Sequence, residues 1–314
     1  MKKIISDLIR QSNSIAIGGH VRPDGDCVGS CMGMYSYIAE HFPDKEVDVY
    51  LTDIPAAFDF IVCDEALEHG HQGDYDLYIA QDCGDVDRLE GSIEKFQSAK
   101  NTICIDHHIS NTEFADHNYV VPEASSASEL ICTLLPIEEM SEFTAKALYT
   151  GIIHDTGVFR HSCTGRQTME IAGKLIEKGF DFGKIIDESF YQKTYKQLKC
   201  MGYCLENAVS EYDGKLCYAV ADYEFINSTG ATSEHFEGTI DQMRTTEGVE
   251  VALLLTEYNP GEVKVSMRSN QYVDVSKIAV ANGGGGHVRA AGATIRKPID
   301  EALATVKELI WTEL

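Results

Sequence analysis

The chain contains 314 residues, of which 44% are hydrophobic, and its 50 acidic and 26 basic residues give a formal net charge of −24. This length fits about two domains, and the hydrophobic content is sufficient for ordinary packed cores. The acidic excess argues against a protein that coats long nucleic acid, because such proteins carry a broad basic surface. It still allows a small phosphorylated ligand held by a few local cations or by a bound metal.

The ten cysteines form no CxxC pair and no regular framework. We therefore expect reduced, mostly buried thiols, as in a cytoplasmic protein. The N-terminal segment has two lysines but lacks the uninterrupted apolar core of a signal peptide. No apolar run approaches the roughly 18 residues that a membrane span needs. The sequence thus predicts a cytoplasmic protein with no membrane partner.

Strand patterns alternate with helix patterns from the N-terminus to about residue 185. After a short amphipathic helix, apolar strands are predicted at 14–20, 46–53, 75–83 and 101–108. Helices are predicted at 29–42, 86–99, 125–135, 141–157 and 166–180. Apolar strands that alternate with helices predict a parallel sheet covered by helices on both faces.

The pattern changes in the second part of the chain. A long helix is predicted over 187–208, followed by strands at 215–225, 249–259 and 262–270, a glycine-rich segment at 281–297 and a terminal helix. We interpret the long helix as a connector. The sequence therefore predicts an N-terminal α/β domain over 1–188, a helical linker over 189–210 and a smaller C-terminal α/β domain over 211–314.

Three of the predicted strands end in residues that are rarely buried without a partner. His20 ends the first strand, Asp82 directly follows LYIAQ near the end of the strand at 75–83, and the triplet Asp106, His107 and His108 ends the strand at 101–108. In open α/β sheets, ligand sites form beyond the carboxyl ends of the strands. We therefore expect these side chains to converge.

Three more carboxylates belong to this pattern. Asp24 and Asp26 lie in HVRPDGDCVGS (20–30), whose proline and glycine predict a turn. Asp155 lies in GIIHDTG (151–157), near the end of a predicted helix. Taken singly, a solvated turn and a glycine-capped helix end would explain these residues equally well.

Taken together, the carboxylates and histidines suit one chemistry. Two divalent cations about 3.5–4 Å apart need roughly six or seven oxygen or nitrogen ligands, with one carboxylate as a bridge. Carboxylate with imidazole suits Mn²⁺ or a similar first-row ion. A solvent molecule between two such ions loses a proton near neutral pH, and the resulting metal-bridged hydroxide is the nucleophile.

These segments also resemble a known family. In order and spacing, four parts of the chain resemble the four motifs of the DHH phosphoesterase superfamily. They are HVRPDGDCVGS, Asp82, the triplet Asp106-His107-His108 and GIIHDTG. SMRS (266–269) and GGGGHVRAAG (283–292) resemble its associated C-terminal substrate-binding domain. The resemblance covers nearly the whole chain. It is strongest to the oligoribonucleases, or nanoRNases, that also dephosphorylate 3′-phosphoadenosine 5′-phosphate (pAp).

The resemblance implies two divalent ions, taken as Mn²⁺, held by six side chains: His20, Asp24, Asp26, Asp82, His107 and Asp155. Asp82 bridges the ions, His20 and Asp24 complete the first site, and the remaining three complete the second. His108 is assigned to the substrate phosphate and the leaving group. Asp106 is assigned to orienting a histidine, as metal-ligating imidazoles usually require. Cys27 stands where relatives often carry alanine and is not an expected ligand.

The second domain is expected to bind the substrate. Consecutive glycines let backbone amides approach an anion closely, and an arginine can bind a phosphate through two hydrogen bonds. The resemblance assigns this role to six residues: Arg268, Ser269, Gly284, Gly285, Gly286 and His287. A flexible glycine loop with no ligand is the alternative.

The sequence therefore predicts a divalent-metal-dependent phosphoesterase that hydrolyses short RNA oligonucleotides to mononucleotides, and also pAp to AMP. Its expected partners are short RNA or small nucleotides, not long duplexes, and a homodimer is implied by resemblance alone. Three alternatives stay open: hydrolysis of linear dinucleotides made from cyclic dinucleotides, a manganese-dependent inorganic pyrophosphatase, and a non-catalytic nucleotide sensor. The GGGGHVRAAG segment argues against the pyrophosphatase, and the intact ligand set argues against the sensor.

Overall fold

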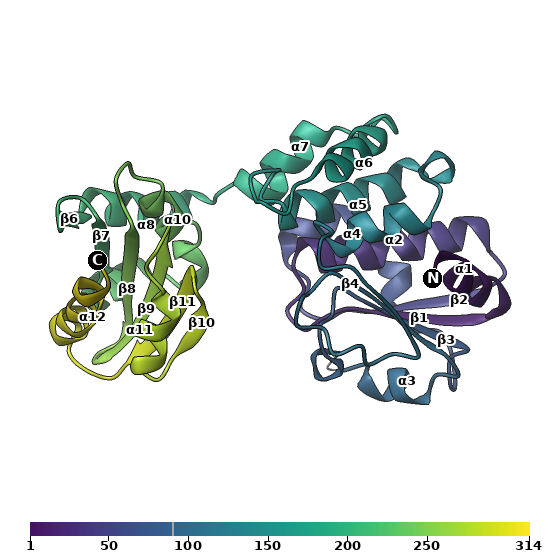
Figure 1. Cartoon of the computed structure of the whole chain (residues 1–314), viewed down its shortest axis with the longest axis horizontal. Coiled ribbons are helices and arrows are strands. Elements are labelled where there is room, and N and C mark those ends of the chain that lie inside the picture. Colours follow the sequence, from purple (N-terminus) through teal and green to yellow (C-terminus); the bar gives the residue numbers. More distant parts are fainter. Residues whose placement is uncertain (90) are drawn as a thin grey trace. The chain divides into compact units, whose positions relative to one another are not determined.

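The chain folds into two compact units, Met1–Gln192 and Lys193–Leu314, in a computed structural model that describes residues 1–89 and 91–314 (Figure 1). The first unit contains a five-stranded sheet in the order β2-β1-β3-β4-β5, and every pair in it is parallel. Its strands are β1 (Ser14–Gly18), β2 (Glu46–Tyr50), β3 (Leu77–Gln81), β4 (Thr102–Asp106) and β5 (His117–Val120). The predicted parallel sheet is confirmed, and β5 is a strand that the sequence analysis missed.

The α-helices of the first unit are α1 (Lys2–Gln11), α2 (Gly25–His41), α3 (Ile93–Ser98), α4 (Ala127–Leu134), α5 (Glu142–Asp155), α6 (Arg166–Ile176) and α7 (Phe182–Ile186). Shorter helical turns are η1 (Ala56–Ile61), η2 (Asp64–Leu67), η3 (Val86–Arg88), η4 (Ile137–Glu139) and η5 (Asp187–Tyr191). The helix predicted over 86–99 is thus two short pieces, η3 and α3.

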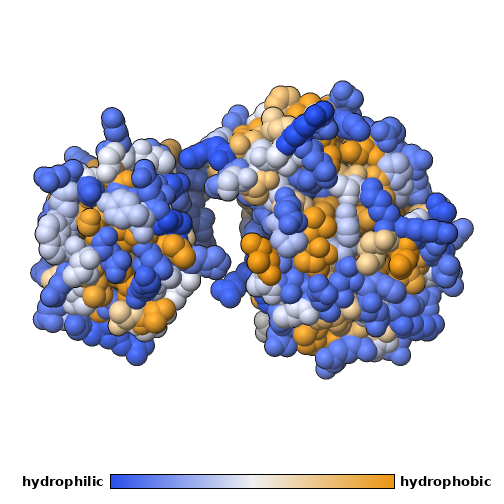
Figure 2. Space-filling model, in the orientation of Figure 1, coloured by the Kyte–Doolittle hydropathy of each residue, from blue (hydrophilic) through white to orange (hydrophobic). Residues whose placement is uncertain are grey.

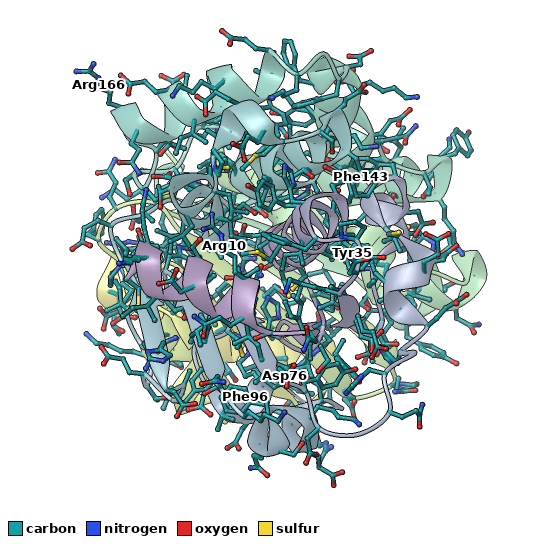
Figure 3. The ribbon with its side chains drawn as sticks, turned by 90° about the vertical axis from the view of Figure 1, so that its right-hand side faces the viewer. Arg10, Tyr35, Asp76, Phe96, Phe143 and Arg166 are labelled. Atoms are coloured by element: carbon teal, nitrogen blue, oxygen red, sulfur yellow. The ribbon has the colours of Figure 1, made fainter. Side chains whose placement is uncertain are left out.

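Both faces of this sheet are buried. Consecutive strand residues point to opposite faces, so Ile15 and Ile17 join the core beneath α2, while Ala16 packs on the other face with Phe96 of α3. In Figure 3, Tyr35 of α2 lies near the middle of the view and Phe96 of α3 near its lower edge. Apolar residues on both faces explain why the strands read as continuous apolar runs. Helices on both faces are therefore confirmed.

Helices α2 and α5 pack unusually close together. A Cβ atom added at Gly29 of α2 would lie 2.5 Å from the carbonyl oxygen of Ala147 of α5. A Cβ atom added at Gly151 of α5 would lie 2.0 Å from Ser128 Oγ of α4. Glycine is therefore required where these helices meet.

The second unit is built on a six-stranded sheet in the order β10-β11-β9-β8-β7-β6, in which only the β7–β8 pair is parallel. Its strands are β6 (Val209–Glu211), β7 (Leu216–Ala221), β8 (Val251–Asn259), β9 (Glu262–Ser269), β10 (Gly285–His287) and β11 (Ala290–Ile295). Its helices are α8 (Tyr195–Glu206), α9 (Tyr223–Thr229), η6 (Ser233–Phe236), α10 (Thr239–Arg244), α11 (Val275–Ala281) and α12 (Ile299–Glu313). The predicted α/β character of this part is confirmed.

The long helix predicted over 187–208 is wrong as one continuous element. Residues 192–194 are not helical, and they separate η5 of the first unit from α8 of the second. Thr194 begins α8 by a capping box with Gln197. Cys200 and Cys204 of α8 are buried in a core of the second unit, so most of the segment expected to be a linker packs within that unit.

The strand predicted over 215–225 is too long at its C-terminal end. It ends at Ala221, because the side chain of Asp222 accepts a hydrogen bond from the backbone of Phe225 and thereby begins α9.

All ten cysteines are free thiols and most are buried, as predicted. Large exposed hydrophobic residues occur in both units, among them Ile109 and Val280. On the face shown in Figure 2, hydrophobic residues are interspersed with hydrophilic ones. Within residues 1–89 and 91–314, no helix combines the length and the apolar content needed to cross a membrane.

The α2–α5 contact yields a stability prediction. Gly29→Ala should lower the free energy of unfolding by about 1–3 kcal/mol, because the added methyl group meets backbone atoms that cannot move aside. Gly173→Ala is the matched control: Gly173 lies in α6, and apart from its chain neighbours and the nearby backbone of its own helix, no described atom lies within 4 Å of the place that its Cβ atom would take. This control should be neutral or stabilising by up to about 1 kcal/mol. Urea unfolding measures both variants, and equal free energies would contradict the tight contact.

Candidate metal centre

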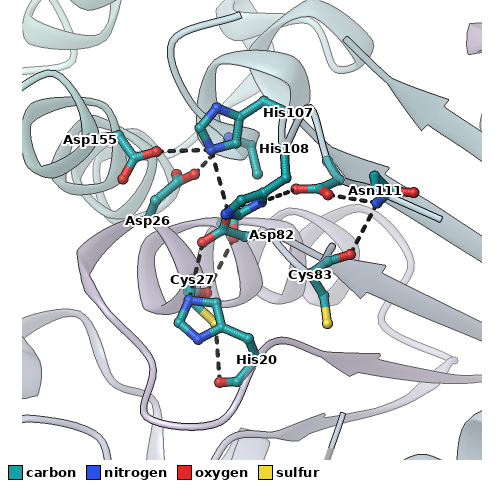
Figure 4. Close-up of polar contacts among 12 residues, drawn as sticks. His20, Asp26, Cys27, Asp82, Cys83, His107, His108, Asn111 and Asp155 are labelled. Carbon is teal, nitrogen blue, oxygen red and sulfur yellow. Dashed lines mark hydrogen bonds and ion pairs between the residues drawn. The ribbon is translucent and has the colours of Figure 1, made fainter. Parts of the chain in front are cut away.

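The predicted residues meet at the carboxyl ends of β1, β3 and β4. The strand order reverses beside β1, which lies between β2 and β3, and such a switch point is where open α/β sheets bind ligands. Asp82 lies centrally: its Oδ2 atom is 3.5 Å from His20 Nε2, and its Oδ1 atom is 3.5 Å from His107 Nε2 (Figure 4). The predicted convergence of these strand ends is confirmed.

Two helices bring further carboxylates to the same place. Asp155, the last residue of α5, lies with Oδ2 2.9 Å from His107 Nε2. Asp26, in the first turn of α2, has a donor atom within 4.8 Å of donor atoms of His107 and Asp155. Asp24 begins α2 by accepting two backbone hydrogen bonds at Oδ1, while its Oδ2 lies 3.7 Å from His20 Nε2.

Asp26 is held by a helix N-terminus that the sequence analysis did not single out. Its side chain is fully buried, its Oδ2 atom accepts a hydrogen bond of 2.6 Å from the amide of Ala127, and its Oδ1 atom accepts one of 3.0 Å from the amide of Ser128. Both amides belong to the first turn of α4, where unpaired N–H groups carry partial positive charge. The helix thereby fixes the position of this carboxylate.

Asp106 and His108 form a separate pair beside Asp82. His108 Nδ1 lies 2.7 Å from Asp106 Oδ1, and Asn111 donates a hydrogen bond of 2.6 Å to Asp106 Oδ2 (Figure 4). Asp106 is fully buried, and these partners satisfy both of its oxygens. Asn111 was missed in the sequence, although its position in the same loop as the DHH triplet could have drawn attention to it.

The pKa shifts in the site reflect three carboxylates that lie close together, those of Asp26, Asp82 and Asp155. Burial raises the pKa of Asp26 and of Asp155, and the charge of Asp82 raises both further. Burial lowers the pKa of His20, but hydrogen bonds to Asp24 and Asp82 outweigh it and raise that pKa to about 10. In the same way, Asp155 and Asp82 raise the pKa of His107 to about 11 against the effect of burial. The site therefore attracts positive charge.

The surroundings of Asp82 indicate whether these residues fit metal ions. Its side chain is 2% exposed, its Oδ1 atom has no hydrogen-bond partner among the described residues, and its backbone φ of 50° is unusual for a residue other than glycine. Leaving a buried carboxylate oxygen unpaired is costly. Asp82 also belongs to two of the three side-chain clusters that could hold a cation. The donor set and this unpaired oxygen fit divalent cations, with Asp82 placed to serve two of them.

In the second unit, Arg268 and His287 share one face of the sheet. Arg268 of β9 lies opposite Ala290 of β11, which lies opposite His287 of β10. Directly opposed residues project to the same face, so the two basic side chains flank a small alanine. Arg268 Nε also lies 3.6 Å from Asp241 Oδ1. Ser269 is buried and donates its hydroxyl to the carbonyl of Val273, which favours a structural role.

The glycine segment is more regular than the loop suggested by its composition. Gly285 and Gly286 belong to strand β10, which pairs with β11. A Cβ atom at Gly284 would lie 2.1 Å from the carbonyl oxygen of Gly292, and one at Gly286 would lie 2.5 Å from Ala291 Cα. These glycines therefore permit close backbone packing, while their role as anion ligands stays a prediction.

Removing Asp82 should remove the cation site. We expect Asp82→Ala to weaken divalent-cation binding by on the order of 100-fold or more, because loss of even an outer-shell partner costs about 10–100-fold. Asp87→Ala is the control, since Asp87 is an exposed carboxylate five residues further along. Calorimetric titration measures affinity, and circular dichroism checks the fold. Equal affinities in a folded Asp82→Ala protein would refute the assignment.

Cation binding should also release protons. His20 and His107 are protonated at neutral pH because their pKa values are raised to about 10 and about 11. A metal ligand must be a neutral imidazole, so the apparent affinity for the cation should increase as the pH rises from about 6 to about 9. Titration in buffers of different ionisation enthalpy counts the released protons. A buffer-independent heat and a pH-independent affinity would contradict this prediction.

Comparison with known proteins agrees with this geometry. Residues 14–152 match the DHH family, N-terminal domain, and residues 213–312 match the DHHA1 domain. The probable bifunctional oligoribonuclease and PAP phosphatase NrnA of Streptococcus mutans is 29% identical over 295 residues, which cover 93% of this chain and 92% of that protein. The bifunctional oligoribonuclease and PAP phosphatase NrnA of Thermus thermophilus is 29% identical in an alignment of 323 positions, which covers 99% of this chain and 94% of that protein.

A solved structure shows the same fold. The crystal structure of an exopolyphosphatase-related protein from Bacteroides fragilis matches with a TM-score of 0.85 and 24% identity, and the match covers 98% of this chain and 94% of that chain. The two domain matches follow one another along the chain in the order that the motifs predict. The chain therefore belongs to the DHH family of phosphoesterases and carries a DHH domain followed by a DHHA1 domain.

Proposed function

We propose that this chain is a divalent-metal-dependent phosphoesterase that hydrolyses short RNA oligonucleotides to mononucleotides and pAp to AMP. The observation that carries the proposal is Asp82, whose buried and unpaired oxygen lies among imidazole and carboxylate donors. The names of the relatives from Streptococcus mutans and Thermus thermophilus support the choice of substrates. The free thiols support a cytoplasmic enzyme, and the homodimer remains a proposal from resemblance.

The proposed ligands fall into two sets that share Asp82. His20 and Asp24 would hold one cation, and Asp26, His107 and Asp155 would hold the other. Two cations of this kind, Mn²⁺ in this proposal, would supply activation of a water molecule and neutralisation of the phosphate charge. The chain contributes the positions of the donors, and the amides of α4 keep Asp26 from turning away.

His108 is suited to protonate the leaving oxygen. The hydrogen bond with Asp106 raises the pKa of His108 above its ordinary value, which favours the protonated imidazole. With Nδ1 bonded to Asp106, the proton at Nε2 is the one free to be donated. Asn111 holds the far oxygen of Asp106 and thereby keeps the pair aligned. A positioned imidazole of this kind contributes typically about 10²–10⁴-fold to the rate.

The second domain would bind the nucleotide. The guanidinium of Arg268 can bind a phosphate through two hydrogen bonds, and His287 lies on the same face two strands away, roughly 10 Å at ordinary strand spacing. A compact pair of basic residues in a chain of net charge −24 supports short substrates over long nucleic acid.

Parallel hydrolysis assays with Mn²⁺ test the proposal. The substrates are a short RNA, a long RNA, pAp, a linear dinucleotide and inorganic pyrophosphate. We expect hydrolysis of the short RNA and of pAp, no hydrolysis of pyrophosphate, and no turnover by Asp82→Ala. Hydrolysis of pyrophosphate alone would overturn the nucleotide role, and hydrolysis of the linear dinucleotide alone would replace the proposed substrates.

Arg268→Ala should raise KM for short RNA by about tenfold or more, since a charged hydrogen bond contributes about 1.5–3 kcal/mol. The amount of metal bound by the Arg268→Ala protein should not change. Arg296→Ala is the control. Arg296 directly follows β11 at the end of that strand that is far from Ala290 and Arg268, and its side chain is 82% exposed. Unchanged KM in Arg268→Ala would remove Arg268 from the substrate site.

A further inference from the structure

A buried thiol lies beside the first set of proposed ligands. Cys27, in the first turn of α2, is fully buried, and its Sγ atom and the donor atoms of His20 and Asp82 all lie within 4.8 Å of one another. The resemblance assigns no role to this position. The structure thus adds sulfur to a set of donors that otherwise contains only nitrogen and oxygen.

The backbone around Cys27 leaves space for this sulfur and holds it in place. A Cβ atom added at Gly19 would lie 2.2 Å from Cys27 Sγ, so the thiol occupies space left by that glycine. The amide of Cys27 donates a hydrogen bond of 3.1 Å to Asp24 Oδ1. The side chain of Asp24 therefore holds the backbone of Cys27 in the first turn of α2.

The hydrogen bonding of the thiol is weak. Its contact is with the carbonyl oxygen of His20 at 3.8 Å, and a thiol is a poor donor. Asp82, the carboxylate beside it, is 2% exposed, and its Oδ2 atom lies 3.5 Å from His20 Nε2. One cation among the Asp82 carboxylate, the imidazole of His20 and the weakly bonded thiol would account for the clustering of these three buried groups.

We propose that Cys27 Sγ is a ligand of the cation held by His20 and Asp82, which makes this site selective for thiophilic ions such as Zn²⁺, Co²⁺ or Cd²⁺. On coordination the thiol proton passes to solvent and the thiolate binds the metal. The second set, Asp26, His107 and Asp155, has only nitrogen and oxygen donors and suits Mn²⁺. The two sites therefore differ in metal preference. This inference rests on the metal centre of the proposed function and refines it.

Cobalt absorption tests the sulfur bond directly. Titration of the metal-free full-length protein with Co²⁺ should produce a near-ultraviolet thiolate-to-cobalt band that saturates at one equivalent per chain. The band should be lost in Cys27→Ser. Cys31→Ser is the matched control, because Cys31 is also fully buried on α2, one turn further along, and belongs to none of the clusters that could hold a cation among the described residues. The thiolate-to-cobalt band of Cys31→Ser should be unchanged.

Affinity gives a second readout. Cys27→Ser should weaken the tightest Cd²⁺ site by on the order of 10–100-fold, in the range found when metal sites lose a supporting group. Mn²⁺ affinity should change by less than about threefold, because Mn²⁺ prefers oxygen and nitrogen donors. Cys27→Ala serves as a second variant if the serine hydroxyl disturbs the buried position, and circular dichroism checks both.

Two results would overturn the proposal. One is the absence of a thiolate band in the unsubstituted protein, and the other is a band or a Cd²⁺ affinity that survives in folded Cys27→Ser and Cys27→Ala proteins. Both readouts are independent of turnover. A thiolate band in a protein that hydrolyses none of the nucleotide substrates would therefore refute the proposed function and leave the Cys27 assignment standing.

Discussion

The concentration of negative charge around Asp82 is the constraint on which the first unit depends. Asp26 and Asp82 are buried with Asp155 close to them, and burial together with mutual repulsion raises the pKa of Asp26 and of Asp155. Such an arrangement is costly unless nearby groups compensate it. The structure supplies the amides of α4 to Asp26 and the imidazole of His107 to Asp155. Asp82 Oδ1 makes no hydrogen bond with the described residues, and His107 Nε2 is 3.5 Å from it, so a cation would complete the compensation at this oxygen.

The helix packing serves this arrangement. Gly29 and Gly151 allow α2 and α5 to approach until backbone atoms nearly touch, and this approach brings Asp26 from the start of α2 to Asp155 at the end of α5. Gly25 has a similar role, since a Cβ atom there would lie 2.3 Å from the ring of His154. Burial lowers the pKa of His154 to about 4, so this half-buried histidine is neutral, and its Nε2 atom lies 3.1 Å from Ser189 Oγ.

The second unit organises its basic residues through strand register. Arg268 and His287 are 19 positions apart in the sequence, yet β11 aligns them across Ala290 on one face. The glycines that precede His287 are needed first for the contact between β10 and β11, because side chains at Gly284 and Gly286 would collide with the β11 backbone. A glycine-rich motif therefore has a packing explanation that is independent of any ligand.

The sequence by itself determined the alternation of strands and helices, the parallel sheet, and the positions where polar residues follow strands, because apolar runs and strand-end residues are local features. Local patterns could not show that the segment over 187–208 breaks at Thr194 or that α8 joins the second core. Nor could they reveal partners brought by distant segments: the α4 amides at Asp26, and Cys27 beside Asp82. These contacts were decided only by tertiary structure, since they arise where helices and loops far apart in the chain pack against the same strand ends.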